Sequence, residues 1–215
     1  IDFDSERLLP HMFSNEGPCI SSYDLNGDDI QDFYLGGAKG QKSSLFLSSK
    51  NGYNEIFEPF SLHKDSEDVQ SIFFDADNDG DKDLYVASGG KAFSKLSRTL
   101  NDRFYRNNSG TFTYESSALN FPKFFSTGAV TTGDINNDGY LDLIVGERFD
   151  VDNYGIPGSV YILMNNGNGK FITKSPKELQ NIGMITDIAF TDINKDERGD
   201  IVIVGEWMPI SVFLN

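Results

Sequence analysis

A short aspartate-rich segment recurs four times along the 215-residue chain and constrains its fold more than any other feature. The copies begin at Asp24, Asp75, Asp134 and Asp192, and these starting points lie 51, 59 and 58 residues apart. In every copy, positions 1, 3, 5 and 9 carry Asp or Asn, and position 10 is apolar. Self-similarity at a regular period of this size indicates a fold built from repeated units.

The residues on either side of each copy have the pattern of β-strands. Short runs rich in Val, Ile, Phe, Tyr and Thr flank each segment, and a third run follows in every copy. In the first three copies a Gly/Asn turn and a fourth run come next, whereas the last copy ends at Asn215.

We therefore predict an all-β fold, a β-propeller of four-stranded antiparallel blades. The residues Ile1–Leu9 are a candidate for the strand that the last copy lacks. The expected domain is a single propeller over residues 1–215, with blades at approximately 10–60, 61–118, 119–176 and an incomplete 177–215.

The spacing of the oxygen-bearing side chains predicts calcium, with up to four Ca²⁺ ions bound. Ca²⁺ takes about 6–8 oxygen ligands, and alternate positions of a tight loop direct their side chains toward one centre. We expect side-chain ligands from positions 1, 3, 5 and 9 and a backbone carbonyl from position 7. The side-chain ligands are Asp24, Asn26, Asp28 and Asp32; Asp75, Asp77, Asp79 and Asp83; Asp134, Asn136, Asp138 and Asp142; and Asp192, Asn194, Asp196 and Asp200. The carbonyl ligands are Ile30, Asp81, Tyr140 and Arg198.

Position 6 distinguishes the four loops. It is Gly in the second and third loops, which allows the positive φ that the turn requires. Asp29 and Glu197 occupy this position in the first and fourth loops, where a side chain strains the turn. Gly27 and Gly199 are expected to redistribute the turn in these two loops, and we expect weaker binding at the fourth.

Other interpretations of the loops fit less well. An EF-hand needs a bidentate Glu at position 12, but here that position is apolar in all four copies. Mg²⁺ prefers to keep its waters and takes few protein ligands. Plain Asp/Asn/Gly hairpin turns without a metal are the structural alternative, and the repeated carboxylate at position 9 argues against them.

Charge and cysteine content narrow the class of protein further. The formal net charge is −15, and sixteen of the 33 acidic residues lie in the four loops. An acidic chain of this kind is a poor partner for nucleic acid. No run approaches the ~20 apolar residues of a membrane span. The single cysteine, Cys19, excludes an intrachain disulfide and is expected to be a buried strand residue.

The loops and the strands after them resemble FG-GAP/VCBS repeats, the calcium-binding blades of integrin-α-type propellers. Three further segments are similar to the bacterial VCBS proteins related to the ASPIC/UnbV group and to cartilage acidic protein: Leu8–Pro18, Ser88–Phe112 and Gly205–Asn215. The resemblance implies a propeller, calcium in the blade loops and an extracytoplasmic location, with any leader absent from this chain. It also implies a fragment of a propeller of about seven blades, completed by other blades or a second chain.

The sequence offers no recognisable catalytic motif. Neither histidine, His11 or His63, has the spacing of a metal ligand or a nucleophile partner, and no nucleotide-binding or serine-hydrolase motif is present. Several other residues near the strand ends are expected to be exposed rim residues, with lining of a face or central channel as the alternative: Glu147, Glu206, Arg148, Trp207, Asp68 and Asp187. Trp207 is the best candidate for a stacking contact, although packing between blades is the expected role.

Two classes of function therefore stay open. One is a non-catalytic, calcium-stabilised binding or adhesion module at the cell surface that recognises a glycan or a protein. The other is part of a lyase-like propeller enzyme that acts on polysaccharide with calcium. A lyase needs a base beside a metal with open coordination positions, and the full ligand sets favour the binding module.

Overall fold

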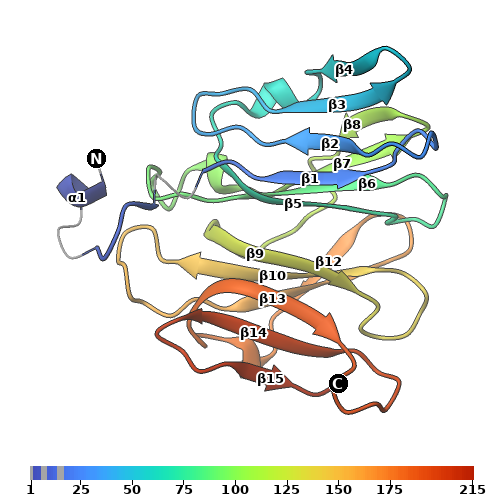
Figure 1. Ribbon diagram of the computed structural model, residues 1–215. Coiled ribbons are helices and arrows are strands. Elements are labelled where there is room, and N and C mark those ends of the chain that lie inside the picture. Colours follow the sequence, from blue (N-terminus) through green and yellow to red (C-terminus); the bar gives the residue numbers. More distant parts are fainter. Residues whose placement is uncertain (1, 6–8, 14–16) are drawn as a thin grey trace.

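The chain folds almost entirely into antiparallel β-sheet (Figure 1), which confirms the predicted fold class. The computed structural model describes residues 2–5, 9–13 and 17–215. Within these residues, three four-stranded sheets and one three-stranded sheet each consist of consecutive strands. The sheets comprise β1 (Ile20–Tyr23), β2 (Asp32–Leu35), β3 (Ser44–Ser49) and β4 (Gly52–Ile56); β5 (Asp68–Phe74), β6 (Asp83–Ser88), β7 (Arg103–Asn108) and β8 (Thr111–Tyr114); β9 (Ser126–Gly133), β10 (Asp142–Phe149), β11 (Val160–Asn165) and β12 (Phe171–Lys174); and β13 (Met184–Thr191), β14 (Asp200–Glu206) and β15 (Ser211–Phe213).

Helical structure is confined to short connecting pieces. The described residues contain a four-residue α-helix, α1 (Asp2–Ser5), and 3-10 turns η2 (Phe60–His63), η3 (Arg98–Leu100) and η4 (Lys177–Leu179). None of these helices has the length and apolar character needed to cross a membrane.

The sheets lie side by side in chain order, as blades of a propeller-type arrangement (Figure 1). Their first strands are neighbours: β1 lies against β5, β5 against β9, and β9 against β13. The expectation that Ile1–Leu9 adds a strand is wrong for its described part, because Asp2–Ser5 is helical and the last sheet consists of β13, β14 and β15 alone within the described residues. Of this segment, Ile1 and residues 6–8 lie outside the described residues, as do Leu8 and residues 14–16 of the Leu8–Pro18 segment.

Each interface between neighbouring sheets buries its own apolar cluster. The side chains that alternate inward along the strands supply these clusters, as expected for stacked antiparallel sheets. Tyr34 and Tyr105 centre the first cluster, Phe74 and Phe104 the second, and Ile185 with its neighbours the third. All eight residues of β10 are buried, because it lies in the interior of the assembly.

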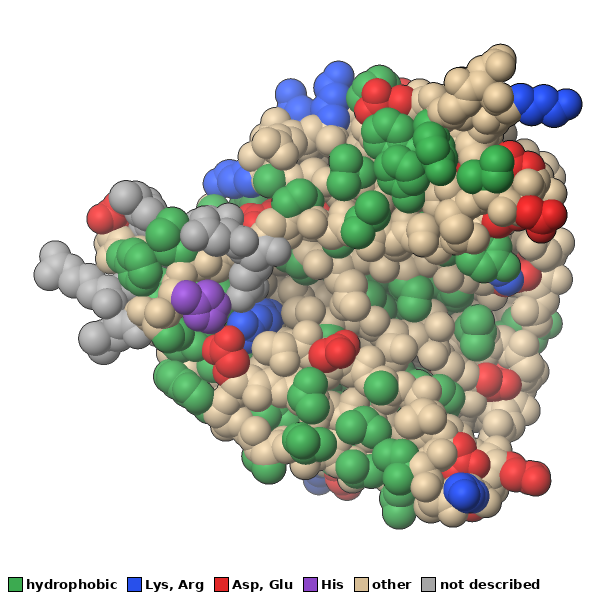
Figure 2. Space-filling model, in the orientation of Figure 1, with side chains coloured by type: hydrophobic (Ala, Val, Ile, Leu, Met, Phe, Trp, Pro, Cys, Tyr) green, Lys and Arg blue, Asp and Glu red, His purple; other side chains and the backbone are tan. Residues whose placement is uncertain are grey.

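The outer face of the first sheet, in contrast, carries exposed apolar side chains. Figure 2 shows hydrophobic side chains gathered over this sheet. Phe33 stacks on Phe46 with ring centroids 4.7 Å apart, and Tyr53 packs edge-on against Phe33. Ile20 is 67% exposed on the neighbouring strand.

Cys19 lies one residue before β1 and is half-buried rather than a buried strand residue. Its Sγ lies 3.4 Å from the hydroxyl of Ser71. Burial raises the pKa of its thiol to about 11, so that the reactive thiolate is scarce at neutral pH.

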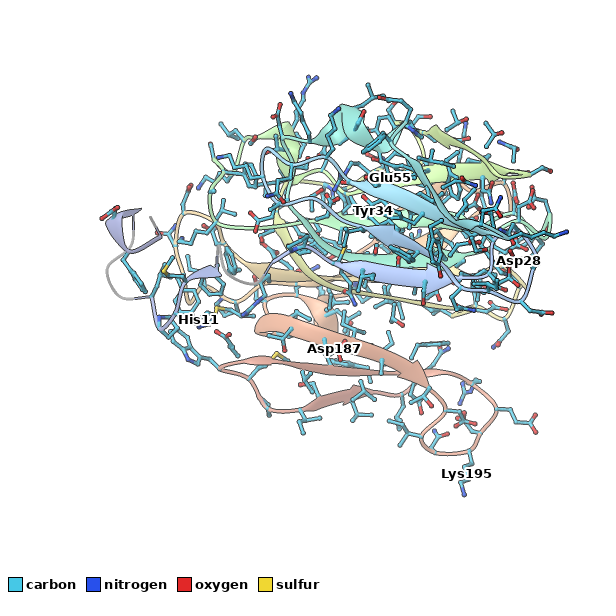
Figure 3. The ribbon with its side chains drawn as sticks, turned by 45° about the horizontal axis from the view of Figure 1, so that its top comes forward. His11, Asp28, Tyr34, Glu55, Asp187 and Lys195 are labelled. Atoms are coloured by element: carbon cyan, nitrogen blue, oxygen red, sulfur yellow. The ribbon has the colours of Figure 1, made fainter. Side chains whose placement is uncertain are left out.

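Antiparallel topology divides the connections into two sets at opposite ends of the sheets. The four acidic loops join the first strand of each sheet to the second, and all lie at one end; Figure 3 shows Asp28 and Lys195 there, in the first and fourth loops. The connections from second to third strands, and from one sheet to the next, lie at the other end, where Figure 3 shows His11. The two ends are therefore separate candidate sites.

Candidate functional site

The four acidic loops share one hydrogen-bond pattern. The position-1 aspartate accepts the backbone N–H of position 6 at N···O distances of 2.8–3.0 Å, and the position-5 aspartate accepts that of position 7 at 2.9–3.0 Å. These bonds turn the carboxylates toward their own loop. The position-1 pairs are Asp24 with Asp29, Asp75 with Gly80, Asp134 with Gly139 and Asp192 with Glu197; the position-5 pairs are Asp28 with Ile30, Asp79 with Asp81, Asp138 with Tyr140 and Asp196 with Arg198.

The backbone is also the same in all four loops, with positive φ at positions 4 and 6. At position 6, φ is 65° for Asp29 and 68° for Glu197, so the prediction of strained side chains at this position is confirmed. The expected redistribution of the turn is wrong, because Gly27 fills a position that is left-handed in every loop, while Gly199 does not have positive φ. Gly199 is needed for packing instead, since a Cβ there would collide with the ring of Phe190.

The position-9 aspartates have a structural role that the sequence did not reveal. They are at most 1% exposed. One carboxylate oxygen accepts the N–H of loop position 2, and the other accepts an N–H from the third strand or, in the last sheet, from two residues beyond it, at 2.5–3.0 Å. Each oxygen keeps a second lone pair with which to bind a cation. The four residues and their third-strand donors are Asp32 with Ser48, Asp83 with Asn107, Asp142 with Asn165 and Asp200 with Asn215.

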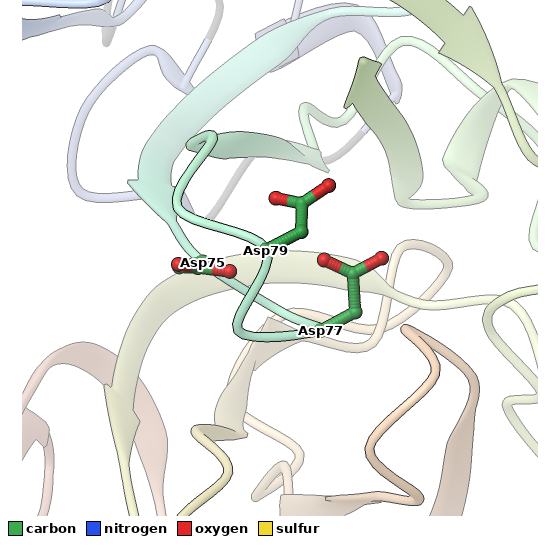
Figure 4. A group of neighbouring side chains, drawn as sticks. All are labelled: Asp75, Asp77 and Asp79. Atoms are coloured by element: carbon green, nitrogen blue, oxygen red, sulfur yellow. The ribbon is translucent and has the colours of Figure 1, made fainter. Parts of the chain in front are cut away.

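The second loop has the most complete set of acidic groups. Asp75, Asp77 and Asp79 each offer a carboxylate oxygen within 4.8 Å of the others (Figure 4). One oxygen (Oδ1) of Asp75 and one of Asp77 are buried and have no hydrogen-bond partner among the described residues. Unpaired buried carboxylate oxygens are unfavourable, and a hard cation such as Ca²⁺ suits this donor set.

The second loop differs from the others in its residue at position 3 and in the arginine beside it. Its position 3 is Asp, whereas Asn26, Asn136 and Asn194 occupy that position elsewhere. Arg106 forms ion pairs with the second oxygen of Asp77 and with Glu115, and so balances part of the added charge.

The fourth loop is the least enclosed, since residues 191–198 are all exposed. The guanidinium of Arg198 donates to Asp196 Oδ2 at 2.7 Å, so a cationic side chain already occupies one oxygen of the position-5 carboxylate. Lys195 and Glu197 have φ of 63° and 68° in this loop, although neither residue type adopts positive φ as readily as Gly or Asn. Competition and strain both argue for weaker cation binding here.

We expect Glu197→Gly to stabilise the protein relative to Glu197→Ala by about 1 kcal/mol, because only glycine removes the left-handed strain while both variants remove the same charge. For a chain of this size the difference corresponds to roughly 2–4 °C in the melting temperature. Thermal unfolding of the two variants side by side measures it. Equal melting temperatures would show that the strain at position 6 is negligible.

At the opposite end of the molecule, three adjoining cavities form a groove along the second and third sheets. The aromatic cavity has a volume of about 490 Å³, the middle cavity about 190 Å³ and the basic cavity about 340 Å³. Phe121 and Phe124 line both the aromatic and the middle cavities, and Asn101, Tyr114 and Ser116 line both the middle and the basic cavities. None of the predicted metal ligands lines these three cavities.

The aromatic cavity combines apolar walls with one ion pair. Phe121 packs edge-on against Phe125 with ring centroids 5.1 Å apart, and Phe149 contributes a further wall. Lys123 Nζ lies 2.9 Å from Glu147 Oε1. Burial raises the pKa of Glu147, and the contact with Lys123 opposes this shift. A largely apolar hollow with a few fixed polar groups is the usual form of a small-molecule site.

The residues expected on an exposed rim divide into two groups. Trp207 and Asp187 are exposed, as predicted. The expected packing of Trp207 between blades holds only in part, because its ring meets Tyr154 of the third sheet's connection edge-on at 5.2 Å but stays 74% exposed. For the others the prediction is wrong, because charged partners compensate their burial. Glu147 pairs with Lys123, Asp68 with Arg103, and Arg148 with the half-buried Glu206.

The structure also places the histidines and several groove residues that sequence reasoning missed. His11 is exposed, and His63 lines the basic cavity with its Nδ1 2.8 Å from the hydroxyl of Tyr105. Most of the missed groove residues lie in connections that differ from copy to copy, and Arg103 begins β7, so no repeat pattern marks them. They are Arg98, Arg103, Phe121, Lys123 and Phe124.

Comparisons with known proteins agree with this architecture. A family model described as FG-GAP-like repeat matches residues 24–86 and 89–145. A similar fold occurs in a solved structure described as the structural basis of specific recognition of non-reducing terminal N-acetylglucosamine by an Agrocybe aegerita lectin, with a TM-score of 0.57 and 17% identity. The alignment covers 87% of this chain and 47% of that one, so this chain spans about half the length of the solved chain. A search of curated proteins gave no match.

Proposed function

The chain belongs to the FG-GAP-like repeat family, and on this premise we propose that it is a non-catalytic glycan-binding module whose acidic loops bind calcium. The observation that carries the proposal is the groove with its aromatic cavity, at the end of the sheets away from the loops. Aromatic walls offer flat apolar faces to a sugar ring, and the Lys123–Glu147 pair offers a donor and an acceptor for its hydroxyls.

In this proposal calcium stabilises the blades and takes no part in chemistry. The unpaired oxygens of Asp75 and Asp77 support a cation at the second loop, and the shared hydrogen-bond pattern extends the proposal to the other three. The predicted ligands lie far along the sheets from the groove, which disfavours the lyase-like alternative, since that needs metal and sugar at one site. The similar fold of a lectin that recognises N-acetylglucosamine supports a sugar over a protein ligand.

The same proposal includes the setting of the module. The exposed apolar face of the first sheet and the three-stranded last sheet support further blades, or a second chain, that cover them. We place the protein outside the cytoplasm, at the cell surface, and among the bacterial VCBS proteins related to the ASPIC/UnbV group. These assignments rest on the resemblance of the sequence.

A glycan array tests the proposal, followed by titration of the best ligand against Phe121→Ala. We expect this variant to weaken binding about tenfold, because it removes an aromatic wall of the groove. Phe57→Ala is the matched control, since Phe57 is also a partly exposed aromatic residue (42%) but lies outside the three cavities of the groove. Equal losses in the two variants, or no binding to any glycan by the wild type, would contradict the proposed site.

A further inference from the structure

The basic cavity at one end of the groove has an unusual set of lining residues. It lies beside η2, η3 and the outer strands of the second sheet, and its volume is about 340 Å³. Its polar lining is rich in hydrogen-bond donors, with two guanidinium groups and no carboxylate. The polar lining residues are His63, Ser66, Arg98, Asn101, Arg103 and Ser116.

Arg103 is the central group of this cavity. Its side chain is 1% exposed, and its Nη2 donates to Asp68 and, at 3.0 Å, to the hydroxyl of Ser88. Its Nε and Nη1 have no hydrogen-bond partner among the residues that the structure describes. A buried guanidinium with unused donors is unfavourable unless an acceptor reaches it.

The neighbouring acid cannot supply that acceptor, because its oxygens are already engaged. Asp68 accepts hydrogen bonds from Tyr34 and Gly37 at 2.8–2.9 Å and from Ser43, in addition to Arg103. It therefore has little capacity left toward the cavity.

The charges around the cavity favour a ligand with a single negative charge. Arg98 is exposed and has no carboxylate partner within the described ranges, so Arg98, Arg103 and Asp68 together leave one net positive charge. Burial and the nearby Arg103 lower the pKa of His63, which disfavours its charged form. The net charge of −15 on the whole chain disfavours a ligand with many negative charges.

The acids along the rest of the groove have partners of their own. Glu115, which lines the middle cavity, is paired with Arg106 at 2.7 Å. Asp102 accepts hydrogen bonds from the hydroxyls of Tyr85 and Thr127 and from the N–H of Ser88. Lys95 and Lys123, which line the aromatic cavity, are paired with Asp152 and Glu147. Among the described groove residues, the positive charge without a carboxylate partner therefore lies at the basic end, on Arg98.

We propose that the basic cavity binds a carboxylate group, with Arg98 and Arg103 as its donors, and that the groove therefore selects an acidic glycan of the uronic-acid type. The choice of a sugar rests on the proposed function; the carboxylate site rests on the cavity itself. Planar guanidinium groups match the two oxygens of a carboxylate, and hydrogen bonds between charged groups are the strong ones.

Titrations of the wild-type chain with sodium acetate, glucuronic acid and glucose test this proposal. Isothermal titration calorimetry measures the affinity of the chain for glucuronic acid and for glucose. NMR follows the Nε–H signal of Arg103 during the titration with each of the three compounds. We expect glucuronic acid to bind at least about tenfold more tightly than glucose, and acetate alone to shift the Arg103 signal. Arg98 lies on an exposed turn, so the substitution Arg98→Gln does not endanger the fold. We expect this variant to lose most of the preference for glucuronic acid over glucose. Phe57→Ala, away from the groove, should retain it.

The outcomes separate this proposal from the proposed function. Equal affinity for glucuronic acid and glucose, with an Arg103 signal that acetate does not move, would overturn the carboxylate site even if neutral glycans bind. A shift of the Arg103 signal by acetate, lost in Arg98→Gln, supports the carboxylate site even if no glycan binds. A preference that Arg98→Gln leaves intact would also overturn the assignment.

Discussion

Removal of calcium with EDTA is expected to lower the melting temperature by roughly 10 °C or more. A ligand present at about 100 times its Kd stabilises the folded state by about 2.7 kcal/mol for each site. In a chain of this size each kcal/mol corresponds to roughly 2–4 °C, and as many as four sites contribute. The unpaired carboxylate oxygens in the second loop are the physical reason, because the cation satisfies groups that otherwise destabilise the folded chain.

Scanning calorimetry with calcium, with EDTA and with EDTA followed by excess Mg²⁺ measures this effect. Only calcium should restore the original melting temperature, because Mg²⁺ gives up its waters reluctantly. Asp79→Ala should also reduce the number of bound calcium ions by one. The position-5 residue is the right choice, since Asp79 is exposed and accepts one N–H from its own loop, whereas substitution of the buried Asp83 would also break a bond to the third strand. A melting curve that EDTA leaves unchanged would refute structural calcium.

Substitution of Asp68 by alanine is expected to destabilise the protein by about 3–5 kcal/mol, because it leaves Arg103 as a buried charge without its partner. Asp68 lies on β5 of the second sheet, while Tyr34 donates to it from β2 and Gly37 and Ser43 donate from the connection between β2 and β3. The loss therefore removes both an ion pair and the polar link between two sheets.

Asp65→Ala provides the control for that measurement. Asp65 lies three residues earlier, is exposed, and forms no hydrogen bond or ion pair with the described residues. Its substitution should change stability by no more than about 0.5 kcal/mol. Urea unfolding measures the free energy of unfolding of both variants. Similar midpoints for the two would show that the buried Asp68–Arg103 pair contributes little to stability.

The sequence predicts the fold well because the information is repeated. Four copies of one pattern place strands on either side of each acidic loop, and the alternation of apolar residues assigns their buried faces. The position-6 strain at Asp29 and Glu197 also follows directly, since left-handed φ is a local property of a turn.

The groove and the buried charged residues could not be predicted from the sequence. Arg98 and Phe121 come from connections that have no counterpart in the other copies, and Arg103 begins β7. Only the packing of the sheets brings these three residues to one groove. Asp68 and Glu147 look like ordinary surface acids in the sequence, because the partner that allows burial lies 35 and 24 residues away. Long-range pairing of this kind leaves no local signal.

The separation of acidic loops and groove at opposite ends of the sheets has a consequence for protein engineering. Most residues of the groove come from the connections between β6 and β7, β8 and β9, and β10 and β11, and none of them belongs to the four acidic loops. These connections can be randomised in a library while all sixteen side chains at positions 1, 3, 5 and 9 stay fixed. New ligand specificities then become selectable on a scaffold whose stabilising turns are left untouched.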